Sequence, residues 1–334
     1  MPLKSESRVR TSLLAVVVIG RNEGERLRIS LSSVVGKTAL TVYVDSGSMD
    51  DSLLLARQLN AEVVELDASV PFTAARARNA GFKRVMTLLP QTEFVQFVDG
   101  DCEVAACWIE SAADHLRVAP GVAAVIGQQH ERYPERSIYN LLCDMEWRWP
   151  IGDVKALPGN MMVRAAAFQA LNGFREDLIA AEDTELGVRF RAHGWKLYAL
   201  DVAMTTHDAN ILRASQWWKR TMRAGYAFAE GVDLHGAPPE RHFVRERRRA
   251  FVWGLALPLA VAVAVVALGT KGLLLLALPG LHLARVFIRT PGTFHERAVY
   301  SVLTMLGKPA EAVGGMRYLL LRWRGRRSAL IEYK

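Results

Sequence analysis

The sequence predicts an α/β protein built on a parallel sheet, followed by an α-helical membrane segment. The sheet is indicated by four apolar runs that alternate with stretches of helical spacing over residues 13–101. Because strands and helices alternate, right-handed crossovers are expected, and these make the strands parallel. The membrane segment is indicated by the apolar stretch 250–289, which basic residues flank on both sides.

The individual elements follow from the spacing of apolar residues. LLAVVVI at 13–19 is apolar without alternation, which is typical of a strand covered on both faces. EGERLRISLSSVV at 23–35 has helical spacing, with Leu27, Leu31 and Val34 on one face. Further strands are expected in LTVYVDSGSMD (40–50), AEVVEL (61–66) and EFVQFVDGD (93–101), and further helices in DDSLLLARQL (50–59) and AARARNAGFKRVMTLL (74–89).

The N-terminal stretch RVRTSLLAVVVIG (8–20) combines a basic start with an apolar run, as a signal peptide does. The apolar run is short, lacks an A-x-A site and continues into Arg21, Asn22 and Glu23. We therefore expect a strand here.

The net charge of +8 is concentrated near the C-terminus. From residue 241 onward there are 16 Lys/Arg and 4 Asp/Glu, against 26 and 30 in residues 1–240. A basic stripe on one domain would be typical of a nucleic-acid-binding protein. Here the positive charge lies on both sides of the most apolar segment. This pattern indicates that the partner is a membrane with anionic lipid headgroups and not a nucleic acid. The three cysteines form no CxxC pair, which fits a reduced cytoplasmic setting.

The apolar stretch predicts a helical hairpin. Residues 250–269 carry no charge and are long enough for a hydrocarbon core of about 30 Å. The second run, 273–288, is interrupted by Pro279, His282 and Arg285, so it either crosses fully or is re-entrant. A buried hairpin of a soluble protein is the alternative. Arginines on both sides argue against it and place both ends in the cytoplasm by the positive-inside tendency.

Polar clusters follow three of the predicted strands. They are Arg21, Asn22 and Glu23, then Asp45 and Ser46, and finally Asp99, Gly100 and Asp101. Ligands of such sheets bind beyond the carboxyl ends of the strands, so we expect one shared site, with solvated turns as the alternative. Carboxylates spaced as Asp99 and Asp101 can hold a hard divalent cation, whose remaining ligands come from water and phosphate oxygens. Such a cation stabilises a departing diphosphate.

Five motifs together resemble the family 2 glycosyltransferases. They are VVVIGRNE (16–23), VYVDSGSMDDS (42–52), AARARNAG (74–81), FVDGD (97–101) and GNMMVRAAAFQALNGFREDLIAAEDTELGVRFRAHGW (159–195). These are inverting enzymes of the GT-A fold, a Rossmann-like nucleotide-diphospho-sugar transferase fold, and they use nucleotide sugars. The resemblance covers roughly residues 12–230, and the chain also resembles the members of the family that carry a C-terminal membrane hairpin.

The resemblance implies a nucleotide site at the strand ends. Glu23 and Asp45 would contact the ribose and base through hydrogen bonds to their carboxylates, with Asn22 beside them. Ser46 stands where the family often has a second acidic residue, so the hydrogen-bond pattern at the base stays open. Arg78 and Asn79 would lie near the nucleotide; a solvated helix arginine with a turn asparagine is the alternative.

The resemblance also implies a metal ligand and a base. Asp101 would be the principal ligand of Mg²⁺ or Mn²⁺, while Asp99 would contact the metal or the ribose. Asp183 would be the catalytic base that takes the proton of the attacking hydroxyl, and Glu182 would hold the acceptor or the neighbouring loop. Without the resemblance, a Glu-Asp pair is more typical of a helix N-terminus. Glu103 is interpreted as a flanking residue.

Several later residues are weaker candidates for acceptor or diphosphate contacts: Trp147, Trp149, Asn160, His207, Trp217, Trp218, Arg220 and Arg223. An arginine could neutralise the diphosphate and a tryptophan could stack on a sugar. The alternatives are a loop packed on the sheet, an interfacial helix and, for His207, a structural histidine. Family members often have Q-x-x-R-W here, whereas this chain has QWWKR at 216–220, so that motif's link to processive synthesis is not carried over.

We therefore expect four regions: a GT-A domain (1–230), a basic linker (231–249), a transmembrane or re-entrant hairpin (250–289) and a basic amphipathic segment (290–334). The last could lie on the membrane surface or end as a solvated basic terminus.

The predicted function is metal-dependent, inverting sugar transfer from a UDP- or GDP-linked donor to a lipid-linked or growing glycan. The catalytic domain would lie on the cytoplasmic side of the inner (plasma) membrane. A polyprenyl-phosphate glycosyl synthase and a non-catalytic nucleotide-sugar-binding scaffold are the alternatives.

Overall fold

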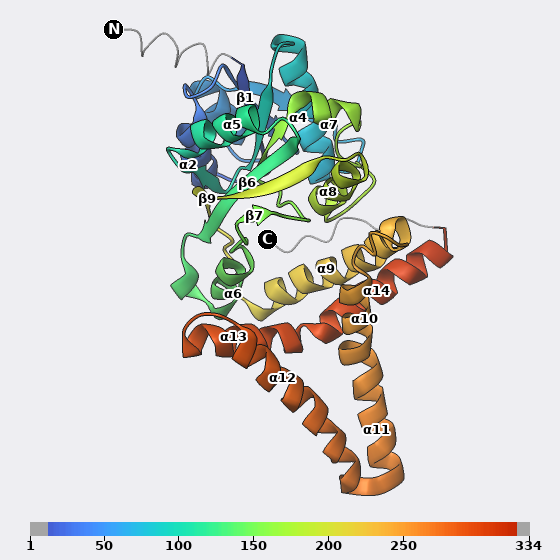
Figure 1. Ribbon diagram of the computed structural model, residues 1–334. Coiled ribbons are helices and arrows are strands. Elements are labelled where there is room, and N and C mark those ends of the chain that lie inside the picture. The colour runs from blue at the N-terminus through green and yellow to red at the C-terminus, as the bar shows by residue number, and fades with distance from the viewer. Residues whose placement is uncertain (1–12, 326–334) are drawn as a thin grey trace. The chain divides into compact units, whose positions relative to one another are not determined.

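A computed structural model describes residues 13–325, whose elements are labelled in Figure 1. The chain forms two compact units. The first contains the chain up to Arg132 together with Trp147–Ala209, and the second contains Tyr133–Glu146 and the chain from Asn210 onward. The division therefore falls near residue 209 and not at the predicted boundary of 230, because α9 (Ala214–His235) packs against α14 (Lys308–Trp323) inside the second unit.

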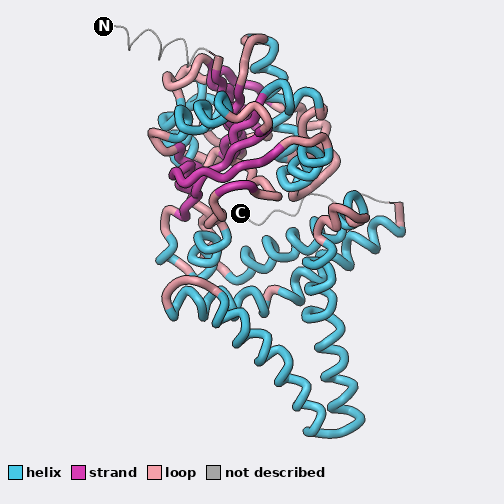
Figure 2. Tube along the Cα trace, viewed as in Figure 1, coloured by secondary structure: helices cyan, strands magenta, loops and turns pink. Residues whose placement is uncertain are grey.

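All strands of the described residues belong to the first unit, as Figure 2 shows in magenta. Their order in the sheet is β3-β2-β1-β4-β8-β6-β9-β5, and β7 pairs with β9 beside this path. The strands are β1 (Leu14–Gly20), β2 (Leu40–Asp45), β3 (Glu62–Glu65), β4 (Phe94–Asp99), β5 (Cys102–Val104), β6 (Val122–Glu131), β7 (Gly152–Asp153), β8 (Met161–Arg164) and β9 (Lys196–His207).

The parallel sheet predicted from the sequence is confirmed for its first four strands. β1 pairs in parallel with both β2 and β4, and β2 pairs in parallel with β3. Beyond β4 the sheet is mixed. β6 pairs in parallel with β9, whereas β8 runs antiparallel to β4 and β6, and β5 runs antiparallel to β9. The prediction did not extend to these strands, because the alternating strand–helix pattern behind it ends at residue 101.

Helices cover the sheet and complete the core of the first unit. They are α2 (Glu25–Val34), α3 (Ser52–Gln58), α4 (Ala74–Leu88), α5 (Trp108–Val118), α7 (Ala165–Ala170) and α8 (Glu182–Ala192). Residues 14–18 of β1 are buried, as expected for a strand covered on both faces. Phe97 of β4 packs against Phe168 of α7 and Phe174, with ring centroids 5.2 and 5.3 Å away.

The strand register brings the three predicted polar clusters to one edge of the sheet. Gly20 of β1 lies opposite Asp45 of β2, and Ile19 lies opposite Asp99 of β4. Because the three strands are parallel, the residues that follow them leave the sheet in the same direction. The predicted gathering of these clusters at the carboxyl ends is confirmed.

The second unit is helical in its described part. It contains the 3₁₀ turn η1 (Pro134–Arg136), α6 (Ile138–Glu146), α9, α10 (Val244–Phe251), the π-helical η2 (Val252–Ala256), α11 (Leu257–Leu268), the 3₁₀ helix η3 (Gly269–Leu276), α12 (Ala277–Arg289), α13 (Phe294–Leu306) and α14. The predicted linker at 231–249 is therefore largely helical, because α9 extends to His235 and α10 begins at Val244.

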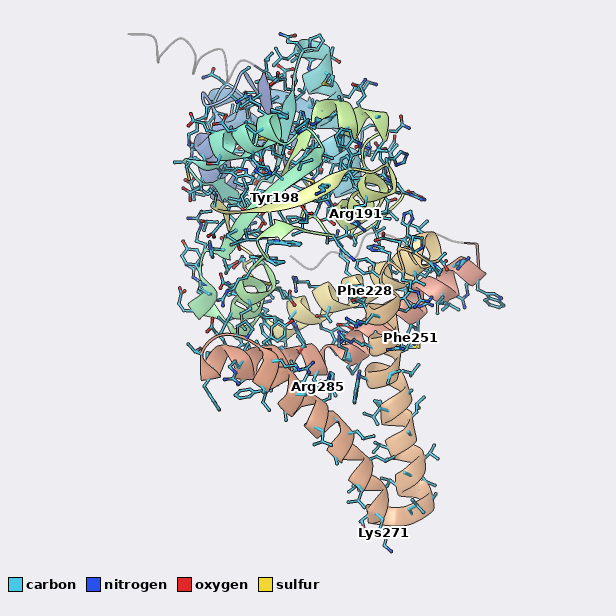
Figure 3. The ribbon with its side chains drawn as sticks, viewed as in Figure 1. Arg191, Tyr198, Phe228, Phe251, Lys271 and Arg285 are labelled. Atoms are coloured by element: carbon cyan, nitrogen blue, oxygen red, sulfur yellow. The ribbon has the colours of Figure 1, made fainter. Side chains whose placement is uncertain are left out.

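The apolar stretch forms a hairpin. α11 and α12 are its two arms, and Lys271 lies at the turn between them (Figures 1 and 3). The ring of Trp253, in η2 just before α11, stacks on the ring of His282 in α12, with ring centroids 4.4 Å apart. Within the described residues, the helical stretch Val244–Arg289 is long and apolar enough to cross a membrane, and its most apolar part is not buried inside the protein.

Two glycines allow α9 and α14 to approach closely. A Cβ at Gly225 would overlap the backbone of Glu311, and one at Gly314 would overlap the carbonyl of Met222. Part of α14 is therefore packed on α9 and is buried, whereas Trp323 near its end is exposed. The last residues of the predicted basic segment, 326–334, lie outside the described residues.

Candidate active site

The cluster after β2 is organised around the buried carboxylate of Asp45. This carboxylate accepts hydrogen bonds from the hydroxyl of Tyr43 at 2.9 Å and from the main-chain nitrogens of Gly47 and Ser48 at 2.9 and 2.7 Å. Burial, and then the neighbouring Asp45, raises the pKa of Tyr43 well above its usual range, so Tyr43 stays a neutral donor. Asp45 is thus held in one orientation at the end of the strand.

The loop after β1 is tied to the loop after β2. Asn22 has a left-handed backbone with φ of 54°, and its side-chain oxygen accepts a hydrogen bond from the nitrogen of Met49 at 2.8 Å. The nitrogen of Asn22 donates to the hydroxyl of Ser48 at 2.9 Å. Glu23 follows, with a carboxylate oxygen 2.8 Å from the guanidinium of Arg26. Asn22 and Asp45 therefore shape a common rim at the carboxyl edge of the sheet.

The buried guanidinium of Arg78, on α4, joins β4 to α8. It lies 2.7 Å from Asp99 and 2.7 Å from Glu182, and only 3% of its side chain is exposed. The two carboxylates compensate for the desolvation of the guanidinium and raise the pKa of Arg78, which therefore keeps its charge. Residues 78, 99 and 182, which are far apart in sequence, thus form one charged group.

Asn79, the neighbour of Arg78, holds the chain that leads to α8. Its side-chain nitrogen donates to the carbonyl of Phe174 at 2.8 Å, and its side-chain oxygen accepts from the nitrogen of Phe174 at 2.9 Å. A further bond at 3.0 Å reaches Glu176. In this structure Asn79 therefore positions the segment before Glu182, a role that the sequence did not suggest.

α8 begins with the predicted Glu182–Asp183 pair. Ala181, just before it, has a φ of 60°, a left-handed conformation that costs an alanine about 1–2 kcal/mol. Asp183 is partly buried, and its carboxylate accepts from the nitrogen of Thr184 at 2.7 Å. Burial, and then the charge of Glu182, raises the pKa of Asp183 to about 7. A carboxylate with this pKa can accept a proton near neutral pH.

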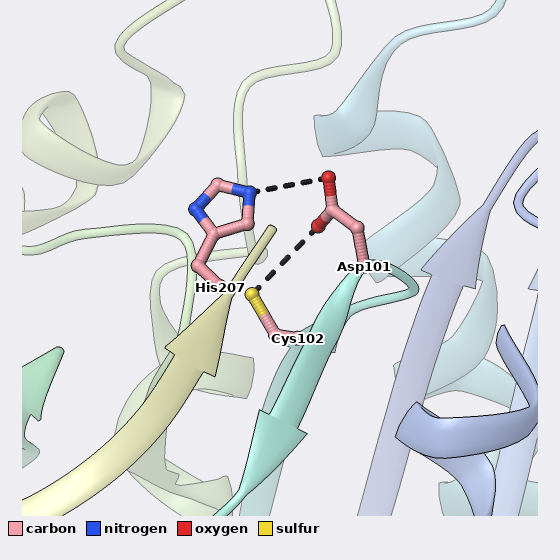
Figure 4. Close-up of side chains that lie close together, drawn as sticks. All are labelled: Asp101, Cys102 and His207. Carbon is pink, nitrogen blue, oxygen red and sulfur yellow. Dashed lines mark hydrogen bonds and ion pairs between the residues drawn. The ribbon is translucent and has the colours of Figure 1, made fainter. Parts of the chain in front are cut away.

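The turn after β4 faces the end of β9, because β5 pairs with β9 and places Cys102 opposite His207. In Figure 4 the imidazole of His207 points toward Asp101, and the two lie 3.1 Å apart through Nε2 and Oδ2. The thiol of Cys102 donates to the other oxygen of Asp101 at 3.7 Å. Asp101, Cys102 and His207 are the group among the described residues whose ligand atoms are close enough together to hold a metal ion.

The donor set of this group fits a hard cation better than a soft one. Asp101 supplies carboxylate oxygens, and Asp99, with 31% of its side chain exposed, lies two residues earlier on the same turn. Burial raises the pKa of the Cys102 thiol well above its usual range, so the thiol stays protonated and is a poor ligand. Oxygen ligands of this kind suit Mg²⁺ and Mn²⁺.

Buried amides lie behind this turn. The side-chain oxygen of Asn160 accepts from the nitrogen of Asp99 at 2.8 Å, and its side-chain nitrogen donates to Gln129 of β6 at 3.2 Å. Gln129 in turn lies 3.3 Å from Nδ1 of His207. Asn160 and His207, two of the weaker predictions, are thus linked to Asp99 and Asp101.

The aromatic candidates divide between the two units. In the first unit, Trp147 stacks on His207 with ring centroids 4.5 Å apart, whereas Trp149 packs against the core. In the second unit, Trp217 is buried and stacks on Tyr139 at 5.6 Å. Of these three tryptophans, Trp147 is therefore the one that contacts the group formed by Asp101, Cys102 and His207.

The remaining candidates belong to α9 in the second unit. Arg220 forms an ion pair with Glu146 at 2.7 Å, and Trp218 is exposed. Arg223 lies one turn further along the same helix. Their contact with acceptor or diphosphate stays a prediction.

Comparison with known proteins finds a family that part of the chain resembles. Residues 15–172 match the model of the family described as glycosyl transferase family 2. This part of the chain, a little under half of its length, is therefore similar to a family 2 glycosyltransferase domain. This domain spans β1 to α7 and thus contains Asn22, Asp45, Arg78 and the Asp99–Asp101 turn, while Asp183 follows it.

Two curated relatives also match this chain. They are pre-mycofactocin glycosyltransferases of Mycobacterium tuberculosis strains CDC 1551 and H37Rv, each 26% identical to this chain over 209 residues. The match covers 58% of this chain and 42% of each relative, so it spans less than half of the relatives' length.

One solved structure shows the fold. A mannosyltransferase from Pyrobaculum calidifontis, in complex with GDP-Man and Mn²⁺, superposes with a TM-score of 0.61 at 19% identity, over 90% of this chain and 87% of that one. The predicted GT-A fold is confirmed by this likeness together with the family match. A glucosyl-3-phosphoglycerate synthase from Mycobacterium tuberculosis, in complex with Mg²⁺ and UDP, superposes with a TM-score of 0.48 at 15% identity, over 70% and 84% of the two chains.

Sequence reasoning missed Gln129 and Cys102 in this candidate site. Gln129 lies within β6, an extended strand whose sequence gives no sign of which side chains face the carboxyl edge. Cys102 follows directly after Asp101, and that position alone could have marked it. Asn160 was found through its motif, but its hydrogen bond to Asp99 needed the fold.

Proposed function

We propose that this chain is a membrane-anchored, metal-dependent, inverting glycosyltransferase. It moves a sugar from a UDP- or GDP-linked donor to a lipid-linked or growing glycan acceptor. The observation that carries the proposal is the charged group around Arg78. It joins Asp99, beside the predicted metal ligand, to Glu182, beside a carboxylate whose pKa is raised to about 7. The family 2 domain supports the same reaction class.

Asp183 acts as the general base of this reaction. The acceptor hydroxyl attacks the anomeric carbon of the donor, its proton passes to a carboxylate oxygen of Asp183, and the bond from that carbon to the diphosphate oxygen breaks. A single displacement of this kind inverts the anomeric configuration. Arg78 keeps its positive charge beside Asp99 and Glu182. It therefore offsets part of the negative charge of these carboxylates, which would otherwise repel the incoming diphosphate.

Asp101 and Asp99 would hold Mg²⁺ or Mn²⁺. When bound, the cation supplies positive charge that stabilises the departing nucleotide diphosphate. Asn22, Glu23 and Asp45 line the neighbouring strand ends, where the base and ribose of the donor would lie. The fixed carboxylate of Asp45 supports this assignment, because an oriented acceptor can select a donor N–H or O–H group.

The hairpin of α11 and α12 anchors the protein in the inner (plasma) membrane, with the catalytic unit on the cytoplasmic side. Its exposed apolar side chains and its basic flanks support this. Arg245, Arg248 and Arg249 of α10 are exposed and form no ion pair among the described residues. Arginines at the membrane boundary favour the cytoplasmic face, where nucleotide sugars are made. Lys271 lies at the opposite end of the hairpin (Figure 3).

Donor and acceptor are tested together. The full chain, purified in detergent or nanodiscs, is supplied with a panel of UDP- and GDP-sugars and either Mn²⁺, Mg²⁺ or a chelator, and the released nucleotide is measured. Membranes, polyprenyl phosphate alone or no acceptor complete the panel. We expect metal-dependent release that membranes accelerate. Product formation with polyprenyl phosphate alone would instead identify a polyprenyl-phosphate glycosyl synthase, and no turnover of any donor would favour the scaffold.

A further inference from the structure

The helix α14 carries an exposed apolar stripe. Val313, Met316, Leu320 and Trp323 are spaced three, four and three residues apart, which places them on one face of the helix. Their exposed fractions are 40%, 38%, 46% and 83%. Among the described residues, this stripe therefore remains at the surface of the second unit.

The other sides of α14 are covered by protein. A Cβ at Gly314 would overlap a carbonyl of α9, and one at Gly315 would lie 3.0 Å from the ring of Phe251, at the end of α10 (Figure 3). The hydroxyl of Tyr318 donates to Asp233 of α9 at 2.6 Å. Because residues 314 and 318 lie on the side away from the stripe, α9 holds α14 with its apolar stripe turned outward.

The charges that border the stripe are positive. Arg317 and Arg324 each lie four residues after a member of the stripe, and both are exposed. The acidic residue of α14, Glu311, is buried, and both of its carboxylate oxygens lie 2.8 Å from Nζ of Lys308. An exposed apolar stripe bordered by arginines is typical of a helix that lies on an anionic lipid surface.

α14 begins at the base of the hairpin, where η2 leads into α11. A Cβ at Gly254 of η2 would overlap the carbonyl of Lys308, the first residue of α14. α14 runs across this end of the hairpin, whereas α11 and α12 extend away from it to the turn at Lys271 (Figures 1 and 3). The start of α14 therefore lies where the hairpin would enter a bilayer.

We propose that α14 is a second membrane contact, whose stripe enters the boundary between lipid headgroups and acyl chains while Arg317 and Arg324 contact lipid phosphates. The occupant is the anionic lipid surface that the hairpin enters, so the inference rests on the proposed anchoring. A helix of this kind buries its apolar face about 5–10 Å into that boundary. Lipid charge should therefore affect how this protein binds a membrane, although residues 250–269 of its hairpin carry no charge.

The depth of the stripe in a bilayer tests the proposal. The full chain with Cys107→Ser, which removes the exposed thiol, receives one fluorophore through Met316→Cys or Leu320→Cys and is placed in nanodiscs that contain phosphatidylglycerol. We expect nitroxides near the headgroups to quench both labels more strongly than nitroxides deep in the acyl chains. Arg322→Cys is the matched control, because Arg322 is exposed on the opposite side of the same helix and pairs with α9. Its label should be quenched least.

A label introduced by Val263→Cys on α11 separates this proposal from the proposed anchoring, because it should be quenched by the deep nitroxides. If it is, and positions 316 and 320 are quenched no more than position 322, the role of α14 is refuted and the hairpin stands. Shallow quenching at 316 and 320 without quenching at 263 would refute the hairpin and support α14. Labels at 316 and 320 that report apolar surroundings but escape every nitroxide would show that protein covers the stripe, which would contradict the proposal.

The two arginines give the second readout. With Val263→Asp and Val266→Asp weakening the hairpin, partition of the full chain onto phosphatidylglycerol liposomes is measured. Arg317→Gln and Arg324→Gln should each lower the partition coefficient about 5-fold, which corresponds to about 1 kcal/mol for a basic residue near an anionic surface. Arg322→Gln removes the same charge from the opposite side and should leave the coefficient unchanged. Equal losses from all three substitutions, or no loss from the first two, would contradict the proposed orientation.

Discussion

At the scale of single residues, the site depends on how burial and charge act on a few carboxylates. Asp183 is the clearest case, because the sequence places it at a helix N-terminus, where a carboxylate usually stays ionised. In the structure, burial and Glu182 act in the opposite direction and raise its pKa to about 7. The environment of Asp183, which the sequence alone does not reveal, makes it suitable as a base.

The raised pKa predicts how turnover depends on pH. A base must be deprotonated to accept the hydroxyl proton, so kcat/KM should fall as the pH drops through about 7 and level off above it. The measurement is the initial rate of sugar transfer at fixed metal concentration across this pH range. A rate already at its plateau at pH 5 would show that the group acting as base has an ordinary carboxylate pKa.

The sequence located most of the polar side chains of the site but not their partners. Asp45, Asp99 and Asp101 were found because they directly follow buried strands, which is a local signal. The ion pairs of Arg78 and the hydrogen bonds of Gln129 join residues that are far apart in the chain. Such partnerships are decided by tertiary packing, and no spacing within the sequence records them.

At the scale of elements, the first four strands were predictable because their apolar runs are continuous and separated by helical periods. β8 and β5 were not, because strands of four and three residues carry too little pattern to set their direction. The end of the first compact unit could not be read from the sequence for a related reason. α9 follows the sheet without a break in composition, and only its packing on α14 assigns it to the second unit.

The contact between α9 and α14 predicts that a glycine-to-alanine substitution destabilises the protein there but not at an open position. Gly314→Ala would place a methyl group into the carbonyl of Met222, and such overpacking costs about 1–3 kcal/mol. Gly280→Ala on α12 meets nothing within 4 Å and should not destabilise the protein. Thermal unfolding in detergent measures both. Equal unfolding temperatures for the two variants would show that α9 and α14 are not packed through this glycine.

At the scale of the whole molecule, the two units divide the proposed work. The first unit carries the carboxylates that are proposed to bind donor and metal, and the second carries the exposed apolar hairpin and the arginines of α10. The charge asymmetry in the sequence anticipated this division. Its acidic part belongs largely to the catalytic unit and its basic part to the helical unit.

The hairpin predicts membrane association that polar substitutions weaken. Val263 and Val266 of α11 are 68% and 89% exposed, and an aspartate costs about 2.5–3.5 kcal/mol at the centre of a membrane helix. Val263→Asp combined with Val266→Asp should therefore reduce co-flotation of the full chain with anionic liposomes. Met49→Asp, which changes an equally exposed residue of the first unit, should float like the wild type. Flotation unchanged by the double substitution would place the hairpin outside the bilayer.

The central claim is that Asp183 removes the acceptor proton in a metal-dependent sugar transfer. Its most direct test is the transfer rate of Asp183→Asn relative to the wild type, with saturating donor and Mn²⁺, alongside donor affinity measured by nucleotide titration. A general base contributes about 10²–10⁴-fold, so kcat should fall by that factor while donor affinity stays near the wild-type value. A folded Asp183→Asn protein that binds donor and transfers sugar at the wild-type rate would contradict the claim.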